Sequence, residues 1–160
     1  FKSEEMDIFI AANCKFFIGS ASGALALAGI FNIPLACANL APMSHTFVRN
    51  RGDISIPKLY RNNENNSLIK FSEVMESEIS NYRHYDEFYK KNITLVNNSS
   101  DEILNVVKEQ YNQINNNLSL NDKDIELQKK FRNLFNKSHY SYYSESIISY
   151  SFLNKYEHLL

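Results

Sequence analysis

The sequence predicts an α/β fold in which helices cover both faces of a parallel β-sheet. Short apolar runs, near residues 15–19, 35–38 and 93–96, alternate with segments of helical pattern. The runs lack the apolar–polar alternation of a half-exposed strand, so we expect strands buried on both faces, as in parallel sheets. Helices between such strands serve as the crossovers that parallel pairing requires. At 160 residues the chain is long enough for one such domain.

Composition and charge are those of an ordinary globular chain and exclude several partners. The chain is 44% hydrophobic and 22% charged, and its formal net charge is −1. A nearly neutral chain has no electrostatic basis for binding nucleic acid or an anionic membrane as its main partner. No apolar run reaches the length of roughly 18 residues that a membrane span needs.

Two cysteines, Cys14 and Cys37, lie in or beside apolar runs and form no C-x-x-C motif. This pattern indicates reduced thiols in a protein core. We therefore expect a protein of the cytoplasm, either free or at the inner face of the membrane. The sequence begins at Phe1 with neither an initiator Met nor a signal peptide, and we expect it to be part of a longer protein.

The strongest local pattern is a strand–turn–helix–strand unit near the N-terminus. A helix capped by Ser3 and extending to about Asn13 precedes this unit. The first apolar run ends at Gly19, and a turn of small residues continues to Gly23. A small-residue helix follows, and it ends before Pro34, where the second run begins. This βαβ pattern is typical of a Rossmann-like sheet.

The remainder of the chain divides into less regular segments. Residues 39–60 show no clear period and contain two prolines, so we expect a long functional loop there. Ser99 and Glu102 form a capping box that opens a helix. Further helices are expected over 71–79, 82–91, 125–135 and 152–160. We assign residues 1–117 to a Rossmann-like lobe and residues 118–160 to a helical C-terminal extension.

A diphosphate-binding site is predicted at the turn Gly19–Gly23. A strand that turns into a helix through small residues leaves several backbone N–H groups without partners. These donors and the helix dipole suit an anion, and glycine lets a ligand approach the backbone closely. The hydroxyls of Ser20 and Ser22 add two donors. Taken alone, the same pattern is equally typical of a purely structural βα turn.

Further candidates follow the next strand. Asn39 and its loop should lie beside the turn, because parallel strands end at one edge of the sheet. Lys58 is the favoured side-chain partner of the phosphate, since a departing nucleoside diphosphate needs a cation. The alternative is a lysine whose stem packs on the sheet. Arg49 and Arg51 are further cations, because guanidinium suits a diphosphate, or else solvated loop charges.

The order of several short motifs resembles that of a family of bacterial glycosyltransferases described mainly from sequence. The resemblance covers nearly the whole chain, and the shared order is more specific than any single motif. The matching segments are Gly19–Gly23, Phe31–Pro34, Asn39–Pro42, Ile56–Leu59, Ser67–Val74, Tyr89–Ile103 and Phe152–Leu160.

This resemblance implies the C-terminal lobe of a GT-B fold, which consists of two Rossmann-like domains. In that fold the C-terminal lobe binds the nucleotide-sugar donor, and residues of both lobes build the active site. The N-terminal, acceptor-side lobe is absent from this chain. The implied activity is transfer of a sugar from a nucleotide sugar to a bacterial cell-surface glycan, with catalysis dependent on the missing lobe. The nucleotide sugar is a substrate, and no cofactor is expected.

Two further residues are candidates at such a site. His45 is a weak candidate for a general base or for a hydrogen-bond partner of a sugar hydroxyl, although a loop histidine often has neither role. Glu73 is a candidate for holding the ribose hydroxyls. In a helix capped by Ser72, it would alternatively complement the helix dipole.

No metal site is expected. Asp122-Lys123-Asp124 matches the D-x-D motif through which another class of glycosyltransferases binds a metal, but it opens a polar helix outside the α/β core. Carboxylates at a helix start are favoured by the dipole alone. The tyrosines within residues 140–150 are interpreted either as a platform for a sugar or, preferably, as packing residues of the tail.

Two other functions stay open at this point. One is the lobe of a sugar-nucleotide epimerase-type enzyme, which shares the two-lobed architecture. The other is a nucleotide- or glycan-binding module without catalysis. Fold alone does not separate these functions. A second α/β domain upstream in the full-length gene would favour an enzyme.

Overall fold

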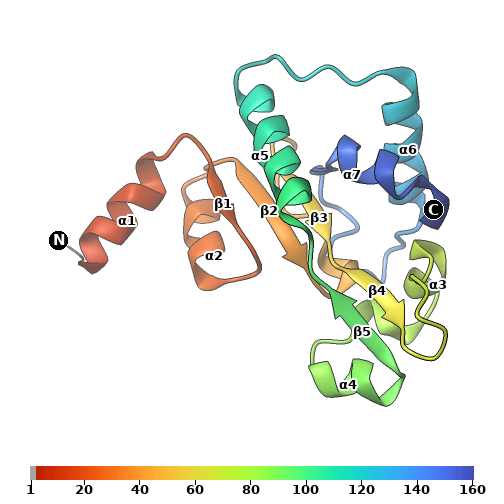
Figure 1. The fold of residues 1–160 in the computed structure, drawn as a ribbon. Coiled ribbons are helices and arrows are strands. Elements are labelled where there is room, and N and C mark those ends of the chain that lie inside the picture. The colour runs from red at the N-terminus through yellow and green to blue at the C-terminus, as the bar shows by residue number, and fades with distance from the viewer. Residues whose placement is uncertain (1–2) are drawn as a thin grey trace.

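The predicted βαβ unit forms the N-terminal part of the parallel sheet. In the computed structural model, which describes residues 3–160, α1 (Glu4–Asn13) begins at its predicted cap, Ser3. Phe1 and Lys2 lie outside the described residues. The strands β1 (Phe17–Gly19) and β2 (Leu35–Leu40) are parallel neighbours, and α2 (Gly23–Ile30) connects them (Figure 1).

The segment 39–60, predicted as a loop, instead contains a central strand of the sheet. A short 3-10 helix, η1 (Met43–His45), is followed by β3 (Ile54–Pro57), which pairs parallel with β2. All four residues of β3 are buried. Ser55 fits there because its hydroxyl donates to the Thr46 carbonyl at 2.7 Å, so the polar residue that obscured the strand pattern is satisfied inside the fold.

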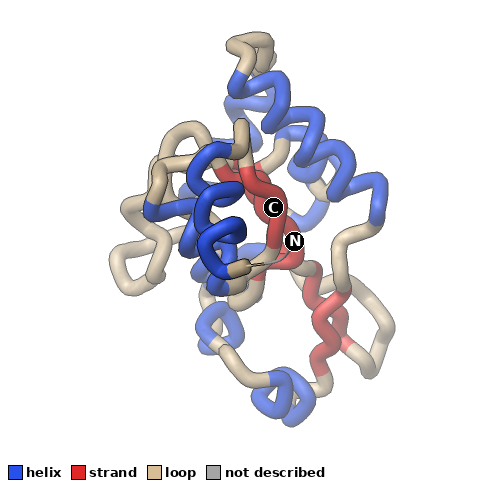
Figure 2. The backbone as a smooth tube through the Cα atoms, turned by 90° about the vertical axis from the view of Figure 1, so that its left-hand side faces the viewer, coloured by secondary structure: helices blue, strands red, loops and turns tan. Residues whose placement is uncertain are grey.

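The third predicted strand exists but does not join the parallel sheet. β5 (Ile93–Val96) pairs antiparallel with β4 (Leu59–Asn62) in a separate two-stranded sheet. This ribbon continues from the end of the parallel sheet and lies beside α4 (Tyr85–Lys90), as Figures 1 and 2 show. The prediction of 93–96 as a parallel strand is therefore wrong. Only Ile93 of this strand is buried, whereas Thr94 is exposed and Leu95 and Val96 are half-buried, as expected for a ribbon outside the buried sheet.

The fourth strand of the parallel sheet comes from the C-terminal extension. β6 (Ile147–Ile148) pairs parallel with β3, which gives the order β1-β2-β3-β6. A two-residue strand carries no periodic pattern, so the sequence predicted only helices after residue 118. The extension does contain the helices α6 (Asp122–Asn133) and α7 (Tyr150–Lys155), followed by η3 (Glu157–Leu159).

The middle helices are shorter than predicted, except for α5 (Ser100–Ile114). That helix begins at its predicted capping box, in which Ser99 and Glu102 exchange hydrogen bonds. The predicted helix 71–79 is divided into α3 (Phe71–Met75) and η2 (Glu78–Asn81). None of the helices within residues 3–160 is both long and apolar enough to cross a membrane.

The two faces of the sheet carry two separate cores, so helices cover both faces as predicted. Successive side chains of a strand point to opposite faces. Leu35 and Cys37 of β2 pack with Ala28 of α2, whereas Ala36 and Ala38 belong to the larger core. That larger core includes Val106 of α5, Phe131 of α6 and the α7 residues Phe152 and Leu153. Both cysteines are free, and burial raises the pKa of the Cys37 thiol to about 12.

The C-terminal segment is fastened to the α/β core by a buried carboxylate. Glu109 of α5 is 2% exposed and accepts hydrogen bonds from the Ser149 hydroxyl at 2.9 Å. It also accepts from the backbone N–H groups of Tyr150 and Ser151, each at 3.1 Å. One side chain thus satisfies three donors at the start of α7, where a helix has unpaired N–H groups.

We expect Glu109→Ala to lower the free energy of unfolding by about 2–4 kcal/mol, because it leaves several buried donors without an acceptor. Glu109→Gln keeps a carbonyl oxygen and should cost less. Urea unfolding of the two variants measures the difference. The control is Glu126→Ala, which removes an exposed i,i+4 pair with Lys130 and should change stability little. Equal losses in Glu109→Ala and the control would contradict this role.

Candidate functional site

Two adjacent cavities include residues at or just after the ends of β1, β2 and β3, and one of them extends to Leu35 at the start of β2. The first, here called the apolar cavity, has a volume of about 320 Å³ and is lined mainly by aliphatic and aromatic side chains, with Ser22, His45 and Arg49 among its polar residues. The second, here called the cationic cavity, has a volume of about 140 Å³ and includes Lys58 and Arg83. Ala41, which directly follows β2, lines both cavities. Carboxyl ends of parallel strands are the usual ligand edge of such sheets.

The predicted anion turn leads directly into α2. β1 ends at Gly19, and Ser22 caps α2 by accepting a hydrogen bond from Leu25 N–H at 3.4 Å. Within residues 3–160 the N–H groups of Gly23 and Ala24 donate to no protein acceptor. A Cβ atom added at Gly23 would meet nothing within 4 Å. The fold therefore leaves open space at Gly23, next to two free backbone donors. Ser20 is exposed beside them.

Ser22 and His45 both line the apolar cavity. Ser22 is the N-cap of α2. His45 is the last residue of η1, and its ring stacks on Tyr140 with 4.3 Å between ring centroids. Tyr140 also lines the cavity, although its own side chain is 77% exposed. Of the tyrosines in residues 140–150, this one therefore takes part in the candidate site.

Arg49 also lines the apolar cavity, but its charged group is directed elsewhere. The guanidinium lies against Gly29 so closely that a methyl group on that glycine would collide with it. Gly29 is six residues beyond Gly23, or about 9 Å along α2. A cation at this end of the helix complements the dipole. The structure thus does not bring the Arg49 guanidinium to the predicted anion position.

Asn39 joins three segments at the edge of the sheet. Its backbone N–H donates to the Asn98 side chain at 2.6 Å, and its own side-chain oxygen accepts from Asn98 N–H at 2.7 Å. The Asn98 amide also donates to the Pro57 carbonyl at 2.9 Å. Asn39 adopts a left-handed backbone conformation, with φ 57°, where β2 shifts register against β3. Its observed role is structural, and it lines the cationic cavity.

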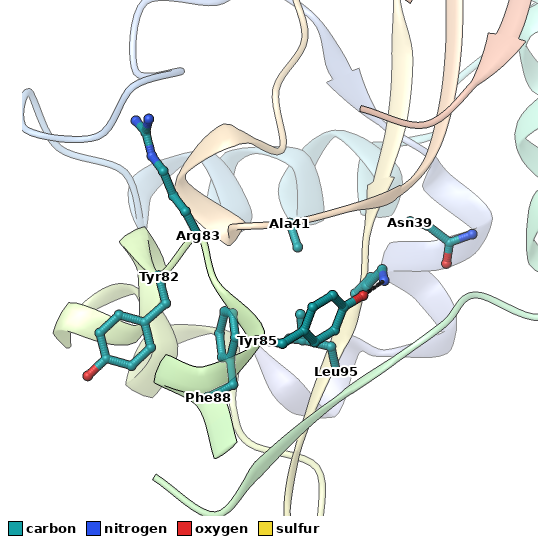
Figure 3. A pocket seen from close by; sticks show the side chains of 8 residues that line it. Asn39, Ala41, Tyr82, Arg83, Tyr85, Phe88 and Leu95 are labelled. Atoms are coloured by element: carbon teal, nitrogen blue, oxygen red, sulfur yellow. Dashed lines mark hydrogen bonds between the residues drawn. The ribbon is translucent and has the colours of Figure 1, made fainter. Parts of the chain in front are cut away.

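Lys58 belongs to the cationic cavity and not to the one that Ser22 lines. Its N–H donates to the Leu40 carbonyl at 2.9 Å, whereas Gly19 pairs with Cys37. At about 3.3 Å per residue, Lys58 lies about 10 Å further along the sheet than Gly19, and two strands across. Its ammonium group donates to the Tyr85 hydroxyl at 3.3 Å (Figure 3).

Glu73 and Arg51 line neither cavity and are exposed. Glu73 lies in the first turn of α3, whose N-cap is Lys70 and not Ser72 as predicted. That position supports the dipole interpretation of Glu73.

The D-x-D motif also acts at a helix start. Asp124 completes a capping box with Asn121 and accepts a hydrogen bond from the Asn154 amide at 2.7 Å. Within residues 3–160, no group of three or more His, Cys, Asp or Glu side chains is arranged to hold a metal ion.

The sequence did not indicate Arg83 or Tyr85, which approach the sheet edge only through the folding of α4 and its preceding loop. Arg83 has an electrostatic effect across the site: burial and the positive charge of Arg83 lower the pKa of His45 below its usual value. His45 is therefore neutral at neutral pH and able to accept a proton.

Comparison of the chain with protein-family models, with curated proteins and with solved structures found no match. The function is therefore argued from the geometry of the two cavities.

We expect Arg83→Gln to raise the pKa of His45, because the variant removes a positive charge that disfavours the imidazolium. An NMR pH titration of the His45 ring protons measures this shift. Lys90→Gln removes an exposed cation of α4 that is not among the causes of the His45 shift, and it should leave the titration unchanged. Identical titrations in wild type and Arg83→Gln would show that burial alone sets the pKa.

Proposed function

We propose that this chain is the donor-binding half of a glycosyltransferase that moves a sugar from a nucleotide sugar to a bacterial glycan acceptor. The observation that carries the proposal is the pair of adjacent cavities at the carboxyl edge of a parallel sheet, one mainly apolar and one cationic. A nucleotide sugar has the same division, with a flat base at one end and a charged, polar part at the other. The order of motifs along the sequence supports the same assignment.

The apolar cavity suits the nucleoside. Its aliphatic wall and the stacked rings of His45 and Tyr140 offer contacts to a planar base, and its volume of about 320 Å³ lies in the range of small-molecule sites. The start of α2 forms part of the same wall through Ser22. A diphosphate attached to this nucleoside would meet the free N–H groups of Gly23 and Ala24.

The chemistry assigned to these residues is stabilisation of the leaving group. When the glycosidic bond to the phosphate breaks, negative charge develops on the nucleoside diphosphate. Fixed backbone donors at a helix start stabilise such charge without rearranging. His45, being neutral, remains a candidate base for the acceptor hydroxyl. Positioning of the acceptor and exclusion of water are assigned to the second lobe. We place the reaction in the cytoplasm or at the inner face of the membrane.

The isolated 160-residue chain should bind a nucleoside diphosphate weakly and show little or no transfer activity, since it supplies one side of the cleft. Calorimetry with UDP, GDP and CMP measures binding, and a transfer assay with and without the N-terminal half measures activity. Full turnover by this chain alone would refute the half-enzyme proposal. Binding without transfer even in the joined protein would favour a non-catalytic module.

Gly23→Val should weaken nucleoside diphosphate binding by about tenfold or more while the domain stays folded. The Cβ atom of the added side chain meets no described protein atom within 4 Å, and the larger side chain narrows the approach to the free donors. Gly52→Val is the matched control: a Cβ there also meets nothing within 4 Å, and Gly52 lines neither cavity. Calorimetry and thermal unfolding of both variants separate lost binding from lost stability. Equal affinity in the two variants would place the diphosphate elsewhere.

A further inference from the structure

We propose that the cationic cavity is a second anion site, which binds a single phosphate or carboxylate group through Lys58 and the Tyr85 hydroxyl. This inference rests on the proposed function for the identity of the ligand, because the anionic group would belong to the transferred sugar or to the acceptor. It is separate from the diphosphate site at the start of α2.

The first argument is that the charge of Lys58, which lies 5.8 Å from the centroid of the Tyr85 ring, forms no ion pair among the described residues. The lysine is partly buried, and the partner that it contacts is the Tyr85 hydroxyl, at 3.3 Å. An ammonium group has three donors. None of the ion pairs found within residues 3–160 involves Lys58 or Arg83. Because Tyr85 accepts from Lys58, its own O–H remains free to donate to the same ligand.

The second argument is the positive charge of the side chains that line the cationic cavity. Among the residues that the structure describes, no carboxylate side chain lines the cationic cavity, whereas two cations do. The nearby Glu87 is occupied in capping α4, where its carboxylate accepts from the N–H groups of Arg83 and His84, both at 2.8 Å. In Figure 3 the Arg83 side chain extends away from Tyr85, toward the upper left of the view. The Arg83 charge therefore adds to the positive electrostatic potential at the rim of the cationic cavity, but its guanidinium does not contact the ligand of Lys58.

The third argument is size and wall chemistry. A cavity of about 140 Å³ is the smaller of the two and holds a phosphate or carboxylate group. Tyr85, Phe88 and Leu95 supply an apolar wall beside the charge. The Tyr85 side chain is 71% exposed, so its ring offers a face on which a sugar that carries the anion can lie.

The fourth argument is the separation from the other site. Lys58 lies about 10 Å further along the sheet than Gly19 and two strands across. Ala41 stands between the two cavities. One anion cannot occupy both places, so a ligand that fills both cavities has a diphosphate and a second acidic group. The source is an acidic donor sugar or a phosphorylated acceptor.

NMR titration of the 160-residue chain with inorganic phosphate, with a hexuronic acid and with a hexose 6-phosphate tests the site. We expect all three to shift signals of α4 and the β3–β4 junction. Lys58→Gln should weaken phosphate binding by about tenfold or more, and Tyr85→Phe by about threefold, since they remove a charged and a neutral hydrogen bond. Lys58→Arg should retain binding. Lys90→Gln, a change of equal charge on α4, should not alter it.

The two ligands that carry a sugar distinguish the sources. Tighter binding of the hexuronic acid assigns the anion to an acidic sugar, and tighter binding of the hexose phosphate assigns it to a phosphorylated group. Unchanged phosphate affinity in Lys58→Gln, with a native spectrum, would overturn the proposal. So would an equal loss in Gly23→Val, because that would place the anion at α2. Phosphate binding through Lys58 without binding of UDP, GDP or CMP would refute the proposed function and leave this site standing.

Discussion

The hydrogen bonds between Asn39 and Asn98 hold together the part of the fold on which both cavities depend. The pair is reciprocal, with backbone-to-side-chain distances of 2.6 and 2.7 Å, and Asn98 also binds the Pro57 carbonyl. It therefore ties the end of β2 to the end of β3 and to the segment that enters α5. Asn39 is in the left-handed region, where Asn is tolerated better than most residues. The register shift that accompanies it places Leu40 with Leu35 and Cys37 on the α2 side of the sheet.

Local chemistry explains which elements could be predicted from the sequence. The cap at Ser3, the βαβ unit and the capping box at Ser99 each depend on neighbouring residues, and the structure contains them as predicted. β3 was missed because Ser55 interrupts its apolar pattern, and its hydroxyl finds a partner only in the folded chain. The predicted pairing of β5 was wrong because a short apolar run does not specify which strand it pairs with. Leu95 pairs with Tyr60, whose hydroxyl is fixed by Met43 N–H, a contact that sequence patterns do not encode.

The candidate site also has a part that local sequence predicts and a part that depends on the folded chain. The open helix start at Gly23 could be predicted, since it follows from a strand, a turn and a helix in sequence. Which charged side chains meet at the site could not be predicted. Arg49 was expected at the anion but lies against the last turn of α2, and Lys58 was expected there but lines the neighbouring cavity. Arg83 and Tyr85 carry no motif and reach the sheet edge only through the placement of α4.

Lys58 gains its position from the junction of the two sheets. It is the single residue between β3 and β4, and its backbone N–H still bonds to β2 through the Leu40 carbonyl. The backbone, and not the side chain, therefore fixes where Lys58 lies. The strands part at this point, and α4 with β5 forms the wall opposite, so the cationic cavity exists only because β5 pairs with β4 and not with the parallel sheet. The ammonium group of Lys58 contacts the Tyr85 hydroxyl and lies over the Tyr85 ring. Its charge is partly buried and has no carboxylate partner within residues 3–160, and it lies beside the edge where ligands of parallel sheets bind.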